Sequence, residues 1–173
     1  MKKLEKKWMS LMKKLNLSLF SLLITLLLLN PSISAEKKII GKAKVIDGDT
    51  IKINGKKIRL FGIDAPELKQ KCSNDSGLYL CGELSKSILD SIELAGVNIR
   101  CTYSNKDKYG RILGTCFRGS VEINKWLVRS GVAVAYKKYS KKYLPDEKYA
   151  RDKKNGIWDG DFIRPEEWRK KNK

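Results

Sequence analysis

Acidic and basic side chains gather in a few short segments of this sequence. Residues 47–50 read Asp-Gly-Asp-Thr, and residues 64–67 read Asp-Ala-Pro-Glu. Oxygen-rich groups of this kind suit Ca²⁺, which binds carboxylates, carbonyls and water. Arg59 and Arg111 add guanidinium groups, whose planar forks match a phosphate. These residue types are suited to metal-assisted chemistry on a phosphate ester.

Each segment also has a simpler interpretation. Asp-Gly is a common turn, Asp-Ala-Pro-Glu can simply end a strand, and a single arginine is most often a surface residue. The chemical hypothesis therefore requires a fold that brings segments 47–50 and 64–67 together with both arginines.

The chain contains no histidine. This absence excludes Ser-His-Asp triads, histidine-metal nucleases and ribonuclease chemistry that uses two histidines. Any hydrolytic chemistry must use carboxylates, Lys, Arg, Tyr or a hard metal ion.

Short β-branched or alternating runs predict the strands that position the acids. Asn54 and Gly55 separate two of these runs and predict a two-residue hairpin, because both turn positions need a positive φ. The polar segment 104–110 predicts a second hairpin. The predicted strands are 44–46, 50–53, 57–63, 97–103 and 111–117.

Apolar residues at helical spacing predict three helices, over 79–95, 121–130 and 145–156. The polar stretch 69–77 predicts a loop, and the lysine-rich tail 170–173 is expected to be disordered. Five strands and three helices predict an α+β fold, a five-stranded OB-fold barrel with three α-helices.

Residues 1–35 differ in composition from the rest. A lysine-rich start precedes an apolar run over 15–29, and small residues follow. This order is typical of a secretory signal peptide. The run is shorter than the ~20 residues of a spanning helix, although length alone does not exclude an uncleaved anchor. Two details stay open: the start (Met1 or Met12) and the cleavage bond (after Ser34 or Ala35).

Residues 36–173 are predicted to form one domain with its core over about 39–168. Six lysines and one glutamate lie in 1–35, which leaves 31 basic and 18 acidic residues and a net charge of +13 in 36–173. Such a charge favours nucleic acid or another polyanion through counterion release. Because basic exported proteins are common, charge alone does not identify the partner.

The cysteines are Cys72, Cys81, Cys101 and Cys116. An even number in an exported chain favours disulfides. No Cys-x-x-Cys pair is present, and the spacings fit no common zinc site. Cys101 and Cys116 fall near facing positions of the second predicted hairpin, which would leave Cys72 to pair with Cys81. Sequence alone permits all three pairings.

Three segments resemble, in the same order, the motifs of the staphylococcal nuclease, or thermonuclease, family. They read Val-Ile-Asp-Gly-Asp-Thr at 45–50, Ile-Arg-Leu-Phe-Gly-Ile-Asp-Ala-Pro-Glu at 58–67 and Asp-Lys-Tyr-Gly-Arg at 107–111. Segments 127–133 and 156–158 resemble the family's closing helices, and the resemblance covers about 41–158. It implies a calcium-dependent endonuclease that cleaves DNA and RNA and leaves 3′-phosphate ends.

The resemblance also implies a calcium site. Asp49 and Asp64 are then side-chain ligands, Ala65 offers its backbone carbonyl, and Asp47 lies behind the direct ligands. Family members with threonine in place of Ala65 have a hydroxyl nearby, which this chain lacks.

By the same resemblance, Glu67 activates or orients the attacking water, while Arg59 and Arg111 bind the phosphate and stabilise its transition state. Hydrolysis adds negative charge around phosphorus, which two arginines and a divalent cation can offset. Because a glutamate with an ordinary pKa of about 4.3 is a weak base, proton abstraction and placement of water both stay open.

Substrate contacts follow from the resemblance as well. Lys108 and Tyr109 match residues that touch a terminal phosphate, and Tyr136 matches a tyrosine near the base. Segment 136–143 alternates lysines with aromatic residues, which suits a nucleic-acid groove or a solvated surface.

Two other functions remain as alternatives: a non-catalytic nucleic-acid-binding OB module, and a surface-tethered polyanion binder that keeps its leader as an anchor. The leading hypothesis expects a secreted or periplasmic monomer without an obligate protein partner, which touches the membrane only through its signal peptide. DNA or RNA preference stays open.

Overall fold

The computed structural model describes residues 1, 4–5, 8–9, 12, 36–93 and 96–172. The chain divides into two compact units, Met1–Ala35 and Glu36–Lys173. Most of the predicted signal peptide lies outside the described residues, and its role stays a prediction. In the part of the chain that is described, no helix has the length and apolar character needed to cross a membrane.

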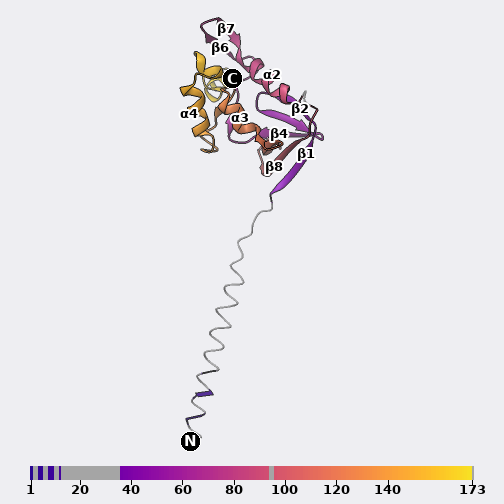
Figure 1. The fold of residues 1–173 in the computed structure, drawn as a ribbon, viewed down its shortest axis with the longest axis vertical. Coiled ribbons are helices and arrows are strands. Elements are labelled where there is room, and N and C mark those ends of the chain that lie inside the picture. The colour runs from indigo at the N-terminus through magenta and orange to yellow at the C-terminus, as the bar shows by residue number, and fades with distance from the viewer. Residues whose placement is uncertain (2–3, 6–7, 10–11, 13–35, 94–95, 173) are drawn as a thin grey trace. The chain divides into compact units, whose positions relative to one another are not determined.

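One curled sheet forms the centre of the Glu36–Lys173 unit (Figure 1). Its strand order is β1-β8-β9-β4-β3-β2, and β10 pairs with β9. Two further pairs, β5 with β11 and β6 with β7, lie outside it. The strands are β1 (Lys37–Gly41), β2 (Ala43–Asp47), β3 (Thr50–Ile53), β4 (Lys56–Leu60), β5 (Ile63–Asp64), β6 (Lys71–Asn74), β7 (Gly77–Leu80), β8 (Ile99–Lys106), β9 (Ile112–Arg118), β10 (Val121–Glu122) and β11 (Val134–Ala135).

A three-stranded antiparallel meander, β2–β3–β4, is joined to the antiparallel hairpin β8–β9 by a parallel pairing of β4 with β9. The turn between β3 and β4 has positive φ at Asn54 (48°) and Gly55 (78°), as the hairpin prediction required. Apolar side chains of the meander and the hairpin meet inside the curl, where Ile58 and Leu60 are fully buried. The predicted α+β barrel of the OB type is confirmed.

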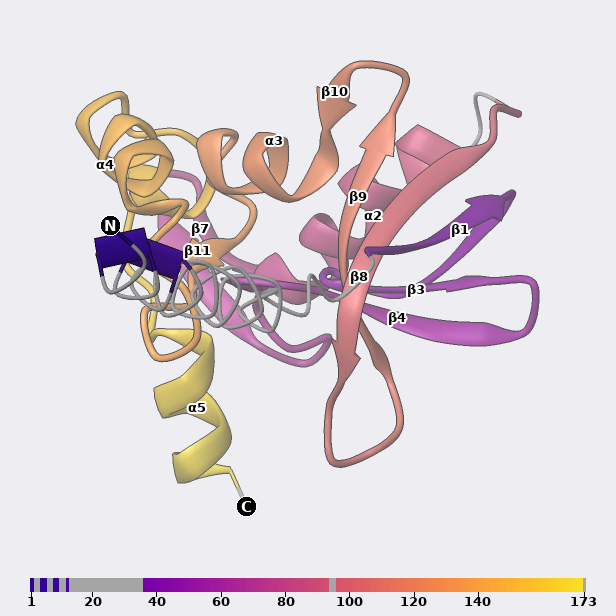
Figure 2. The ribbon, with the colours of Figure 1, turned by 90° about the horizontal axis from the view of Figure 1, so that it is seen from below.

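Helices cover the open sides of the barrel (Figure 2). The helix α2 contacts β2, and α3 contacts both β9 and α4. The three predicted helices correspond to α2, α3 and α4, and α5 is a fourth α-helix within the described residues. The helices are α2 (Cys81–Glu93), α3 (Ile123–Arg129), α4 (Leu144–Asp152), the 3₁₀ helix η1 (Gly156–Asp159) and α5 (Pro165–Lys171).

Both favoured disulfides are present: Cys101–Cys116, predicted from the second hairpin, and Cys72–Cys81, the pairing that this leaves. Cys101 and Cys116 are register partners on β8 and β9. The Cys72–Cys81 disulfide joins β6 to the start of α2.

Two local predictions were wrong. The stretch 69–77 was expected to be a loop, but it contains β6 and the start of β7, because Cys72 is held in a hairpin that is bonded to α2. The tail was expected to be disordered from Lys170, yet α5 continues to Lys171. Pro165 in its first turn and basic residues in its last turn favour that helix.

Candidate active site

The turn between β2 and β3 presents two acids. The backbone N–H of Asp49 donates to Asp47 Oδ1 at 3.1 Å, which fixes a tight Asx turn. A Cβ at Gly48 would lie 2.7 Å from the Cβ of Ala65 and 2.9 Å from that of Ser85, so only glycine lets this turn pack against its neighbours. Burial raises the pKa of Asp47, although bonds from Thr50 and the positive charge of Arg59 oppose that shift.

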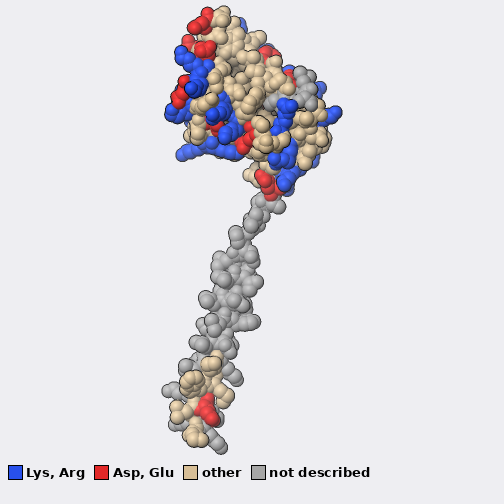
Figure 3. Space-filling view, in the orientation of Figure 1, with Lys and Arg blue, Asp and Glu red and all other residues tan. Residues whose placement is uncertain are grey.

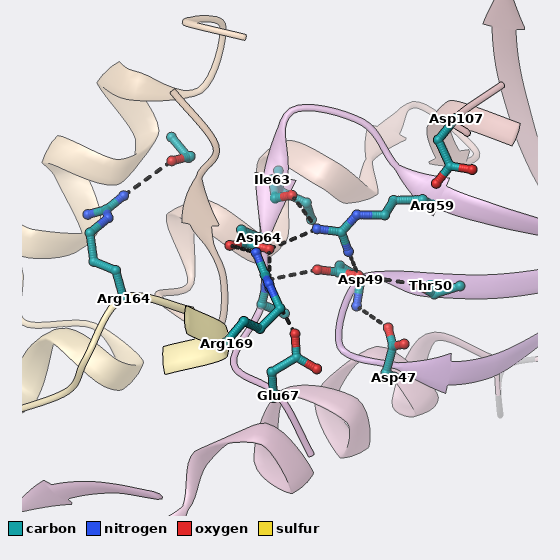
Figure 4. Close-up of polar contacts among 12 residues, drawn as sticks. Asp47, Asp49, Thr50, Arg59, Ile63, Asp64, Glu67, Asp107, Arg164 and Arg169 are labelled. Atoms are coloured by element: carbon teal, nitrogen blue, oxygen red, sulfur yellow. Dashed lines mark hydrogen bonds and ion pairs between the residues drawn. The ribbon is translucent and has the colours of Figure 1, made fainter. Parts of the chain in front are cut away.

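Arg59 on β4 joins the acids of two elements (Figure 4). Its guanidinium forms an ion pair with Asp49, and its Nη2 donates to Asp64 Oδ1 at 2.8 Å. Gly62, with a φ of 78°, turns the chain between β4 and β5 so that Asp64 faces Arg59. Asp49 and Asp64 are nearly fully buried, and the arginine neutralises part of their charge.

The segment after β5 continues the site toward α2. The N–H of Ala65 donates to Asp49 Oδ2 at 2.9 Å, so this residue lies directly beside the first acid. Glu67 lies against the first turn of α2, where a Cβ at Gly82 would be 1.8 Å from the Glu67 carbonyl oxygen. The N–H of Glu67 donates to the buried Gln70 side chain at 3.2 Å, and the side chain of Glu67 is 39% exposed. Glu67, a half-exposed acid, is therefore held next to the buried pair of acids, Asp49 and Asp64.

The loop between β8 and β9 carries Arg111 and is organised by Asp107. One carboxylate oxygen of Asp107 accepts the N–H groups of Tyr109 and Arg111, both at 2.9 Å, and the other accepts Arg111 Nε at 2.8 Å. Burial alone would raise the pKa of Asp107, but these hydrogen bonds outweigh it and lower that pKa. Lys108 and Arg111 both lie over the exposed Tyr109 ring, at 5.0 and 5.7 Å from its centre.

A pocket of 710 Å³ joins these parts. Nine of the ten predicted site residues line it, and Asp64 lies beneath it in contact with Arg59. Tyr136 and Tyr139 also line the pocket and pack edge to face with ring centres 4.7 Å apart, and Lys138 lies between them in the sequence and lines the pocket as well. The nine are Asp47, Asp49, Arg59, Ala65, Glu67, Lys108, Tyr109, Arg111 and Tyr136.

Arg169 on α5 is a site residue that the sequence did not predict. Its Nη1 donates to Asp64 Oδ1 at 3.0 Å and to Glu67 Oε1 at 2.8 Å, and its Nη2 donates to Asp64 Oδ2 at 2.9 Å. Burial alone would lower its pKa, but the two carboxylates raise that pKa instead. Figure 4 shows Arg169 reaching the acids from the side opposite Arg59. A helix-start signal at Pro165 was visible in the sequence, but the contact spans about a hundred residues and has no local signal.

A family model described as "Staphylococcal nuclease homologue" matches residues 57–160, which is more than half of the chain. The chain belongs to the staphylococcal nuclease family. The match includes Arg59, Asp64, Glu67 and Arg111 but ends before α5. Membership accounts for the barrel and for the order in which the acidic and arginine segments follow one another.

Individual relatives agree with this assignment. The chain is 42% identical to the succinoglycan biosynthesis protein ExoI of Rhizobium meliloti over 135 residues, which are 76% of this chain and 71% of that protein. It is 37% identical to an uncharacterized endonuclease of Escherichia coli, over 73% of this chain and 81% of that protein. An uncharacterized endonuclease of Haemophilus influenzae is 35% identical, over 88% and 86% of the two chains.

The family is generally calcium-dependent, and the donor atoms here fit that ion. Asp49 and Asp64 supply buried carboxylates, and Ala65 lies beside them with its backbone carbonyl. These are hard oxygen ligands of the kind Ca²⁺ prefers. Among the described residues, no three acidic, cysteine or histidine side chains form a metal cluster. Two carboxylates, a carbonyl and water need no such cluster.

Proposed function

We propose that this member of the nuclease family is a calcium-dependent endonuclease that hydrolyses phosphodiester bonds of DNA and RNA and leaves 3′-phosphate ends. The observation that carries this proposal is the pocket itself. Two arginines on different hairpins, Arg59 and Arg111, border one cavity together with Asp49 and Glu67, and Asp64 lies directly beneath. A pocket of this composition can bind an anionic phosphate and direct a water molecule at it.

Asp49, Asp64 and the carbonyl of Ala65 would hold the calcium ion, and Asp47 would support Asp49 through the Asx turn. Bound there, Ca²⁺ supplies a Lewis acid that offsets charge on the phosphoryl oxygens. The acids would otherwise repel a phosphate, so their neutralisation is a condition for substrate binding.

Arg59 and Arg111 donate hydrogen bonds to the non-bridging phosphate oxygens, and they stabilise the negative charge that grows during attack. Glu67 accepts a hydrogen bond from the attacking water and orients it. The side chain of Glu67 is 39% exposed where it lines the pocket, so water has access to it. No histidine is required for these roles.

The nucleic-acid chain itself is proposed to run along the rim. Lys108 and Tyr109 lie on the β8–β9 loop, Tyr136 and Lys138 lie in the segment that follows β11, and all four line the pocket. The ring of Tyr136 lines the pocket and offers a face on which a base can stack. Figure 3 shows Lys and Arg spread over one face of the Glu36–Lys173 unit, which favours association with a polyanion.

Export to the periplasm or the exterior is part of the same proposal. The two disulfides, Cys72–Cys81 and Cys101–Cys116, support it because such bonds persist in oxidising compartments. Detection of a shortened chain that begins near Glu36 outside the cytoplasm would test it directly.

The test of the activity uses the purified Glu36–Lys173 unit with single-stranded DNA and with RNA, in millimolar Ca²⁺ or in a chelator. We expect cleavage only with Ca²⁺ and products that carry 3′-phosphates. Salt-sensitive binding without cleavage in either condition would instead support a non-catalytic binding module.

A further inference from the structure

The C-terminal segment is anchored beside the site by polar groups that are themselves buried. The fully buried Gln70 donates its Nε2 to the carbonyl of Ile163 at 2.6 Å. Arg164 donates to Glu147 at 3.0 Å and to the carbonyl of Ala135 at 3.2 Å. A buried hydrogen-bonding group is costly to leave unpaired, so these contacts fix the start of α5. Arg169, one turn later, is therefore delivered to a defined place.

Arg169 makes contact with the reacting half of the pocket. Both carboxylate oxygens of Asp64 accept its guanidinium, and one of them also accepts Arg59. The same guanidinium reaches Glu67 at 2.8 Å. Arg169 thus bridges Asp64, the proposed metal ligand, and Glu67, the proposed water-binding acid. Each oxygen of Asp64 accepts a hydrogen bond from at least one guanidinium.

A divalent cation and a guanidinium that bind the same carboxylate oxygen compete with each other for it. Three guanidinium hydrogen bonds already fall on the two oxygens of Asp64, two of them from Arg169, so a calcium ion bound to Asp64 must share this carboxylate with Arg169. Two positive charges held a few ångströms apart also repel each other, and this repulsion is strong where water is largely excluded. Asp64 is 1% exposed.

We propose that Arg169 is a positioning residue that holds Asp64 and Glu67 in the metal-free enzyme and competes with Ca²⁺ for Asp64, so that α5 sets the calcium affinity of the site. This inference rests on the calcium dependence proposed above. Calcium binding moves the guanidinium off at least one oxygen of Asp64, while Glu67 and the ring of Tyr136, 6.0 Å from Arg169, remain within its reach.

The experiment measures Ca²⁺ binding to the Glu36–Lys173 unit by isothermal titration calorimetry, without substrate. Arg169→Met keeps much of the apolar stem but removes the charge. We expect its dissociation constant for Ca²⁺ to fall by roughly tenfold, which corresponds to about 1.4 kcal/mol. Lys170→Met is the matched control, because Lys170 lies on the same helix, is 68% exposed and pairs only weakly with Glu166 at 3.6 Å. Its calcium affinity should match that of the wild type.

A structural role for Arg169 alone would lower the melting temperature and leave calcium affinity unchanged or weaker, and that result would overturn the inference. Arg169→Lys keeps the charge without the planar fork and is expected to bind Ca²⁺ with an affinity between those of the wild type and Arg169→Met. Arg169→Lys therefore tests the inference even if Arg169→Met does not fold. A wild type that binds no Ca²⁺ would overturn the proposed calcium dependence itself and this inference with it, whereas unchanged affinity in the variants overturns only the inference.

Discussion

The two arginines proposed to bind phosphate are supported in different ways. Arg59 lies on a barrel strand, its side chain is 14% exposed, and its partners are the proposed metal ligands Asp49 and Asp64. Arg111 lies at the end of a loop, its side chain is 29% exposed, and it has an acid of its own, Asp107. One arginine therefore shares acids with the metal, and the other does not.

This difference separates two tasks within one pocket. On the barrel side, arginines balance the charge of the acids that are proposed to bind the metal ion, so a change at one residue alters the others. On the loop side, Asp107 fixes Arg111 through a local hydrogen-bonded turn. Changes there should affect substrate while leaving calcium affinity intact.

Removing each arginine in turn is expected to slow the reaction strongly. Arg59→Ala should lower kcat by about 10³-fold and Arg111→Ala by about 10²-fold, since each removes a donor to developing charge. Calcium titration should show tighter binding in Arg59→Ala, which loses a cation beside Asp49, and unchanged binding in Arg111→Ala. Equal shifts of calcium affinity in the two variants would remove the distinction between the two sides.

Asp107→Asn tests the loop side by itself. The variant keeps an oxygen for the backbone turn but loses the ion pair with Arg111, so we expect KM to rise by about fivefold with little change in calcium affinity. Steady-state kinetics at several Ca²⁺ concentrations measure both quantities.

The difference in the free energy of unfolding between the wild type and Asp107→Asn should also depend on pH. Because the folded protein lowers the pKa of Asp107 below 3.8, the charged form stabilises the fold above that pH, and the stabilisation is lost as pH falls below 3.8. The stability gap between wild type and Asp107→Asn should thus be constant near neutral pH and close in acid. A gap that widens in acid would contradict the assignment.

A smaller effect is expected at Asp47. Burial raises its pKa, which means that its charge costs stability at neutral pH. In a chelator, Asp47→Asn should melt at a higher temperature than the wild type, while its calcium affinity falls by about tenfold, as is common when groups that support metal ligands are changed. Thermal unfolding with and without Ca²⁺ measures both. A lower melting temperature in chelator would show that the charge of Asp47 stabilises the fold.

Local sequence patterns predicted the barrel side well. Asn54-Gly55 specified its turn, and the acids and arginines lie in short segments next to strands, so local signals located them. The hairpin from Lys71 to Leu80 was missed because its strands depend on a disulfide to α2 more than on alternation. The first strand, β1, was not predicted either, since its lysines hide the pattern of a strand paired with β8.

Arg169 shows the limit of local patterns most clearly. Its contacts with Asp64 and Glu67 span 105 and 102 positions, and the buried bond from Gln70 to Ile163 spans 93. From sequence alone, a tail rich in lysine and arginine is expected to be exposed to solvent. The tail becomes part of the site only because hydrogen bonds hold Ile163 and Arg164 in place.

The most direct test of the account is the single-turnover cleavage rate of Glu67→Ala at saturating Ca²⁺, compared with the wild type on the same single-stranded DNA. Because Glu67 is the acid proposed to hold the attacking water, we predict a rate lower by about 10²- to 10⁴-fold with substrate binding retained. A variant that cleaves as fast as the wild type would contradict the assignment of this pocket as the catalytic site.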